Sequence, residues 1–177
     1  PLSTENLNRD AAQLCGLLAV IADVFDELAA GGRWRLHVIG DLTKLPPATA
    51  ERIVAAQQRT AHACGLDVNI AVAYSGRLDL LHAVRSLIAE HVAAGTVDQL
   101  LAQLSPELIA SRLYTAGQPE PDLVIRTSGE QRLSNFMLWQ TAFSEFYFTP
   151  TCWPDFGRDD FEQAIDAYGK RARRFGM

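Results

Sequence analysis

Two arginines and several hydroxyl and glycine residues follow the apolar segment 122–125 in the last third of this 177-residue chain. Arg126 ends that segment, and Arg132 and Ser134 complete a stretch of nine residues. A guanidinium offers paired donors to phosphate oxygens, and glycine lets the backbone approach a ligand closely. The spacing therefore favours a site for an oxyanion such as phosphate. The alternative is a solvated turn in which Arg126 pairs with Glu130.

A carboxylate interrupts the aromatic segment 143–148, where Glu145 stands among three phenylalanines and a tyrosine. Burying an unpaired carboxylate in such surroundings is costly, so Glu145 is expected to have a cationic partner. That partner is either an arginine, in an internal salt bridge, or a hard divalent ion such as Mg²⁺.

Polar and basic groups also gather near both ends of the chain. The opening segment carries Ser3, Asn6 and Arg9 before the first expected helix, and the tail 170–177 holds four of the 16 basic residues. Each pattern has a plain structural interpretation, because hydroxyl and amide side chains cap helix starts and basic residues complement helix C-termini.

Apolar periodicity predicts helices that alternate with strands. The helices are expected at about 14–28, 46–65, 78–92 and 159–174, with short ones after Thr96 and Ser105, and the strands at 35–39, 67–74, 122–125 and 143–148. This order predicts an α/β fold in which a mainly parallel central sheet is covered by helices, with residues 1–177 as a single domain. Ligands bind at the carboxyl ends of the strands in such sheets, and Arg126 falls at one of them.

Composition excludes several classes of protein. The net charge of −5 argues against a nucleic-acid partner, and 48% hydrophobic residues argue against disorder. Three widely spaced cysteines favour a reducing compartment, and no apolar run is long enough to span a bilayer. We therefore expect a cytoplasmic protein without a transmembrane segment. The sequence contains no HExxH, Walker or GxGxxG motif.

Taken in order, the motifs resemble those of the cis-prenyltransferases, the family of undecaprenyl diphosphate synthase and the short-chain Z-isoprenyl diphosphate synthases. The resemblance covers almost the whole chain. The matching strings are Ser3-Thr4-Glu5-Asn6 with Arg9, Asp122 to Arg126 with the following Thr-Ser-Gly-Glu, Arg132-Leu-Ser134-Asn135-Phe136, Trp139-Gln140, Ser144-Glu145-Phe146-Tyr147-Phe148, Trp153-Pro154-Asp155-Phe156 and Arg174-Phe175-Gly176. So long an ordered series is much more specific than any single motif.

The resemblance implies an Mg²⁺-dependent transferase that condenses isopentenyl diphosphate with an allylic diphosphate, geranyl or farnesyl diphosphate, to give a Z-configured polyprenyl diphosphate. It also implies a homodimer, and its lipid product leaves peripheral membrane contact open. The implied roles are substrate binding by Arg9, Arg126, Arg132 and Ser134, catalysis by Asn6 and Ser3, Mg²⁺ binding by Glu145, and completion of the partner's phosphate site by Arg174 and Gly176.

Two departures from the family pattern qualify this expectation. The family motif D-G-N-x-R-W, which supplies an aspartate for Mg²⁺ and amides for the allylic diphosphate, is absent. We expect that an N-terminal strand–helix–strand portion of the domain is missing from this chain. The alternative is a non-catalytic subunit that activates a catalytic partner, although such a subunit would be expected to lose Arg126, Arg132 or Glu145 as well. Leu7, where many long-chain members have Trp, and Pro1 favour a shorter product.

Overall fold

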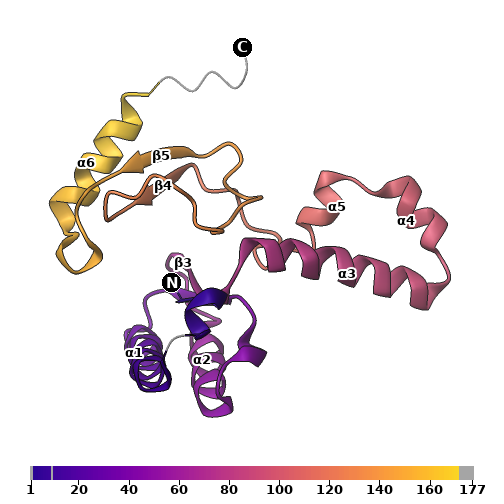
Figure 1. The fold of residues 1–177 in the computed structure, drawn as a ribbon, viewed down its shortest axis with the longest axis horizontal. Coiled ribbons are helices and arrows are strands. Elements are labelled where there is room, and N and C mark those ends of the chain that lie inside the picture. The colour runs from indigo at the N-terminus through magenta and orange to yellow at the C-terminus, as the bar shows by residue number, and fades with distance from the viewer. Residues whose placement is uncertain (1, 9, 172–177) are drawn as a thin grey trace. The chain divides into compact units, whose positions relative to one another are not determined.

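The computed structural model describes residues 2–8 and 10–171, which fall into two compact units, Pro1–Gly117 and Gln118–Met177 (Figure 1). The first unit contains β1 (Leu2–Ser3), η1 (Thr4–Asn8), α1 (Ala11–Ala30), β2 (Arg35–Ile39), η2 (Leu42–Lys44), α2 (Pro47–Thr60), β3 (Asp67–Tyr74), α3 (Gly76–Ala94), α4 (Val97–Gln103) and α5 (Pro106–Ala110). The second contains β4 (Leu123–Arg126), β5 (Glu145–Phe148), η3 (Trp153–Asp155) and α6 (Arg158–Gly169).

The strands of the first unit form a parallel sheet in the order β1-β3-β2. Because β3 lies in the middle, its second half is buried from Ala71 to Tyr74. The core is formed by residues from α1, α2 and the three strands, with Phe25, Leu36 and Ile53 fully buried. The short helices α4 and α5 pack along α3 (Figure 1).

The second unit is built on the parallel pair β4-β5, against which α6 packs. Leu123 is opposite Glu145 at the start of the pair, and Arg126 is opposite Phe148 at its end. This register puts the end of β4, and the loop that follows it, at the carboxyl edge of the pair.

The predicted mainly parallel α/β architecture is confirmed, since every strand pair in residues 2–8 and 10–171 is parallel and helices alternate with strands. The strands pair in groups of three and two, and the assignment of residues 1–177 to a single domain stays a prediction. No helix in the described part of the chain combines the length and the apolar character needed to cross a membrane.

Local signals in the sequence explain most helix starts but not all. Ser105 Oγ accepts a hydrogen bond from the Leu108 amide, as the Ser-Pro signal predicts. The helix expected after Thr96 forms as α4, but the Thr96 side chain does not cap it, because Thr96 has φ −120° and ψ 31° instead of the extended conformation of an N-cap residue. The last helix ends at Gly169, earlier than predicted.

The short strand β1 was missed by the sequence analysis, which considered a helix cap as the structural alternative to a catalytic role for this segment. The side-chain cap of α1 is Asp10, whose carboxylate accepts hydrogen bonds from the Ala12 and Gln13 amides. The segment before it instead pairs with β3, which places Ser3 beside Tyr74.

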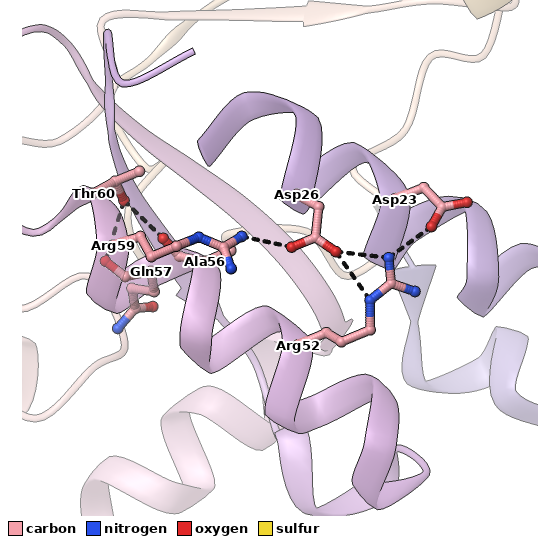
Figure 2. A network of polar contacts seen from close by, with 7 residues as sticks. All are labelled: Asp23, Asp26, Arg52, Ala56, Gln57, Arg59 and Thr60. Atoms are coloured by element: carbon pink, nitrogen blue, oxygen red, sulfur yellow. Dashed lines mark hydrogen bonds and ion pairs between the residues drawn. The ribbon is translucent and has the colours of Figure 1, made fainter. Parts of the chain in front are cut away.

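An ionic network joins α1 to α2 on the surface of the first unit (Figure 2). Asp26 receives Arg52 Nη2 at 2.7 Å on one carboxylate oxygen and Arg59 Nη2 at 2.5 Å on the other, and Asp23 also contacts Arg52 at 2.7 Å. The hydrogen bonds from Arg59 and Arg52 lower the pKa of Asp26 below its ordinary value of 3.8. The network therefore favours the packed helix pair while Asp26 is ionised.

Replacement of Asp26 by asparagine should lower the Tm at pH 7, because Arg59 loses its charged partner and Arg52 keeps only Asp23. A carboxyl whose pKa is lowered by folding stabilises the folded state above its ordinary pKa and loses this effect as the pH falls through the folded-state value. The Tm difference between wild type and Asp26→Asn should therefore shrink as the pH falls below about 4. Thermal denaturation followed by circular dichroism between pH 7 and pH 2 measures it.

The matched control is Glu162→Gln, which removes the charge from a single exposed pair with Arg158. Glu162→Gln should lower the Tm at pH 7 by less than Asp26→Asn does, because an isolated exposed ion pair contributes little to stability. An Asp26→Asn difference that stays constant across the pH range would contradict the ionic origin of the effect.

Candidate functional site

Arg126 lies where β4 ends, and one nitrogen of its guanidinium has no partner within the described ranges. Its Nη2 lies 3.5 Å from Ser134 Oγ, which is a weak contact at the limit of a hydrogen bond. Its Nε is buried and has no hydrogen-bond partner in the described part of the chain. Leaving a buried donor of a charged group unsatisfied costs free energy, and an anion bound here would remove that cost. This geometry fits the predicted anion site.

The loop after β4 has an unusual backbone that brings Ser134 back toward Arg126. Ser128, Ser134, Asn135 and Met137 all have positive φ, between 47° and 66°. Left-handed conformations cost on the order of 1 kcal/mol or more for most residues other than glycine, so this concentration of them is costly. Such strain is common where a loop must present particular groups to a ligand.

Other groups of this loop are already engaged. Arg132 pairs with Glu130, so the alternative pairing of Arg126 with Glu130 is not formed. The amides of Ser128 and Gly129 donate to the Thr151 and Thr149 carbonyls, both at 2.9 Å. These two amides are therefore not free to bind an anion. The sequence analysis had expected the glycine of this loop to let the backbone approach a ligand closely. Arg132 keeps an exposed side chain, so a ligand can reach it.

Glu145 has the arginine partner that was one of the two predicted alternatives. Its Oε2 lies 2.6 Å from Arg171 Nη1, and its side chain is 31% exposed. Glu145 starts β5 opposite Leu123, whereas Arg126 is opposite Phe148, so the two positions are three register steps, roughly 10 Å, apart along the strands. The structure does not bring the Glu145 backbone to the end of β4 where Arg126 lies.

Glu145 is the only metal ligand that the sequence analysis proposed. No group of three or more His, Cys, Asp or Glu side chains in residues 2–8 and 10–171 could hold a metal ion. Mg²⁺ is commonly bound through one or two carboxylates together with substrate phosphates and water. A partly exposed single carboxylate fits that mode of binding and does not fit a site made by the protein alone.

Ser3 and Asn6 lie at the carboxyl edge of the three-stranded sheet. Ser3 pairs with Tyr74 at the end of β3, and Asn6 follows in η1; both side chains are half-buried. Gly40 leaves β2 at the same edge with φ +132°, and a Cβ there would lie 2.0 Å from the Val72 carbonyl oxygen. Only glycine allows this close approach of β2 to β3, and Asp41 follows it. The structure thus brings the predicted pair, Ser3 and Asn6, together at this edge.

The sequence analysis missed a buried polar cluster beside this edge. The Asp79 carboxylate accepts hydrogen bonds from Tyr74 Oη at 3.1 Å and from the Tyr114 amide at 3.0 Å. The only sequence signal was an acidic residue in the first turn of a helix, which usually indicates a surface residue. Burial, followed by the charges of Asp41 and Asp79, raises the pKa of Tyr114 above its ordinary value.

Three predicted site residues, Arg9, Arg174 and Gly176, lie outside the described residues. Their expected roles in substrate binding and in completing a partner's site stay predictions. The described candidates thus lie in three places: Arg126 at the end of β4 with Arg132 and Ser134 in the loop that follows, Glu145 at the start of β5, and Ser3 with Asn6 at the end of β1 and in η1.

Comparison with known proteins extends over the whole chain. Residues 1–176 match the family model described as "Putative undecaprenyl diphosphate synthase". The chain is 51% identical to "Isoprenyl transferase 1" of Corynebacterium diphtheriae and 48% identical to "Short-chain Z-isoprenyl diphosphate synthase" of Mycobacterium leprae. Each alignment covers 99% of this chain, and 67% and 68% of those proteins respectively.

A solved structure shows the same fold. Lavandulyl diphosphate synthase from Lavandula x intermedia, crystallised with dimethylallyl diphosphate, superposes with a TM-score of 0.92 at 36% sequence identity. The match covers 99% of this chain and 76% of that protein.

Inorganic diphosphate should bind the wild-type protein, and Arg126→Ala should weaken this binding between about 10- and 100-fold, because hydrogen bonds to charged groups are worth about 1.5–3 kcal/mol. Ser134→Gly should weaken it less, since glycine keeps the left-handed backbone and removes only the hydroxyl. Isothermal titration calorimetry measures both dissociation constants.

Arg158→Ala serves as the matched control, because Arg158 is an exposed arginine whose contact is Glu162. It should bind inorganic diphosphate as the wild type does. Equal affinities of the Arg126→Ala variant and the wild type would exclude Arg126 from the anion site.

Proposed function

The chain belongs to the prenyltransferase family of undecaprenyl diphosphate synthase, and on that premise we propose that it condenses isopentenyl diphosphate with geranyl or farnesyl diphosphate to a short, Z-configured polyprenyl diphosphate. The observation that carries the proposal is the buried Nε of Arg126, which lies beside Ser134 and has no hydrogen-bond partner among the residues that the structure describes. A diphosphate supplies the anionic oxygens that this group lacks.

Isopentenyl diphosphate is held through its diphosphate at the end of β4. Arg126 donates from Nε and from its terminal nitrogens, and the Ser134 hydroxyl adds a further donor. Arg132 exchanges its contact with Glu130 for the substrate. Fixing the diphosphate orients the double bond of isopentenyl diphosphate toward the allylic carbon of the other substrate. Such positioning lowers the activation barrier, because two substrates held in the right geometry react as if they were one molecule.

The bond changes define what the remaining residues do. The allylic carbon–oxygen bond breaks and releases diphosphate, a carbon–carbon bond forms from the double bond of isopentenyl diphosphate, and that substrate loses one proton. Negative charge therefore grows on the leaving diphosphate, where preorganised donors stabilise it. Ser3 and Asn6, at the end of β1, are assigned to the reacting ends of the substrates, and Arg9 to the diphosphate.

Mg²⁺ is proposed as the cofactor, held by Glu145 together with substrate phosphates. When bound, the ion neutralises phosphate charge without any proton transfer. Arg171, which contacts Glu145 at 2.6 Å, keeps this half-buried carboxylate paired when no cation is present.

The active form is proposed to be a cytoplasmic homodimer in which Arg174 and Gly176 reach the partner's phosphate site and the lipid product brings the enzyme to a membrane surface. A short product is supported by the name of the Mycobacterium leprae relative and by Leu7, which stands where many long-chain members of the family have Trp.

Radiolabelled isopentenyl diphosphate should enter a butanol-extractable product only when the full-length protein has both an allylic primer and Mg²⁺. Arg126→Ala should lower kcat/KM by roughly 100-fold or more, because the lost contacts hold both substrate and transition state. Arg158→Ala should keep the wild-type rate. Thin-layer chromatography of the dephosphorylated products measures chain length.

An inactive wild type that activates a separate prenyltransferase would overturn the catalytic proposal in favour of an accessory subunit. A long-chain product would overturn only the proposed product length.

Glu145→Gln should raise the Mg²⁺ concentration needed for half-maximal rate by roughly tenfold, because glutamine can still accept from Arg171 but no longer attracts a cation. Arg171→Ala is the matched control: it breaks the same pair but leaves the carboxylate in place. If both variants only lower the Tm and leave the Mg²⁺ requirement unchanged, Glu145 has a structural role alone.

A further inference from the structure

Asp79 is a buried carboxylate that the proposed mechanism does not use. It lies in the first turn of α3, and only 1% of it is exposed. A first-turn acid complements the helix dipole from the surface at little cost, but burying its charge costs several kcal/mol unless hydrogen bonds replace the lost water. The dipole alone therefore does not account for this position.

The partners of Asp79 come from two separate segments of the first unit. Tyr74 ends β3, five residues earlier, and donates its hydroxyl; Tyr114 lies 35 residues later and donates its backbone amide. The two tyrosine rings meet edge to face, with centroids 6.4 Å apart, and His82 stacks on Tyr114 with centroids 5.5 Å apart. One carboxylate thus fixes both the end of β3 and the segment after α5.

This cluster lies at the same sheet edge as the residues proposed to act on the substrates. Tyr74 is the residue of β3 that pairs with Ser3, and η1, which carries Asn6, packs against β3. Tyr114 also lies close enough to Asp41, after β2, for that charge to act on its phenol. A shift of Tyr74 would therefore be passed directly to Ser3 through the strand pairing.

We propose that Asp79 is a positioning residue for the reaction: by holding Tyr74 and Tyr114, it fixes the edge from which Ser3 and Asn6 act. The inference rests on the proposed function for its catalytic consequence. A misplacement of about 1 Å can cost roughly 100-fold in rate, so a group that touches no substrate can still control turnover.

Steady-state kinetics of Tyr74→Phe and Asp79→Asn, expressed per folded protein, test the proposal. Tyr74→Phe removes one hydroxyl and keeps the ring, so kcat should fall roughly tenfold while the KM for isopentenyl diphosphate, assigned to the loop after β4, stays within about twofold. Asp79→Asn keeps an oxygen acceptor and the shape of the side chain. Its kcat should therefore lie between those of Tyr74→Phe and the wild type.

Thr60→Val is the matched control for lost stability. Thr60 is equally buried, and its hydroxyl accepts from the Leu36 amide near the start of β2, away from the carboxyl edge. It should lower the Tm without lowering kcat. An unchanged kcat in Tyr74→Phe, or an equal fall in kcat in Thr60→Val, would overturn the proposal.

Hydrogen–deuterium exchange separates this proposal from the function on which it rests, because it requires no activity. In Asp79→Asn and Tyr74→Phe, the Tyr114 amide and residues 2–8 should exchange faster than in the wild type, while residues 35–39 should not change. A wild type without turnover would refute the proposed function alone. Exchange that is unchanged, or faster in all segments alike, would refute the positioning role.

Discussion

The buried Nε of Arg126, which has no hydrogen-bond partner among the described residues, is the constraint on which the account of the second unit depends. Arginine stays charged at any physiological pH, so a buried Nε without an acceptor cannot escape its cost by losing a proton. Residues 2–8 and 10–171 do not supply the missing acceptor: Glu130 pairs with Arg132, and Glu145 pairs with Arg171. The left-handed backbone of Ser134 adds a hydroxyl donor beside Arg126, which increases the demand for an anion. The free folded state is thereby less stable than it could be, and a diphosphate offsets that deficit on binding.

Parallel strand pairing explains why both groups of site residues lie where they do. Ser3 ends β1, Gly40 leaves β2 and Arg126 ends β4, so each unit presents its polar groups where its own strands stop. The buried positions of the strands in the first unit are mostly apolar, so the polar groups of the site come from strand ends and loops. Residues at such an edge need hydrogen bonds to groups inside the unit to hold them in place. The buried Asp79 carboxylate provides two of these, to Tyr74 and Tyr114.

The regular elements and the position of Arg126 at a strand end were predictable from the sequence, whereas the partners of the side chains were not. The strand at 35–39 matches its predicted range, because hydrophobic periodicity is a local property, and Arg126 was placed correctly at a strand end. A two-residue strand such as β1 has too few residues to show a period, so it was missed. The sequence analysis predicted that the partner of Glu145 is an arginine or a metal ion, but it could not say which arginine. Arg171 is 26 residues away in the chain, and only the tertiary structure brings it next to Glu145. Asp79 was missed for the same reason.

The most direct measurement is the ¹H–¹⁵N resonance of Arg126 Nε, assigned by its loss in Arg126→Lys, as isopentenyl diphosphate is added to the full-length protein. If the buried Nε is the unfilled donor of the substrate site, its signal shifts with saturation and its proton exchanges more slowly with water, because the donor gains a charged acceptor. The Nε signal of the exposed Arg158 should stay unchanged. An Arg126 signal that does not move at saturating isopentenyl diphosphate would contradict the proposed binding site.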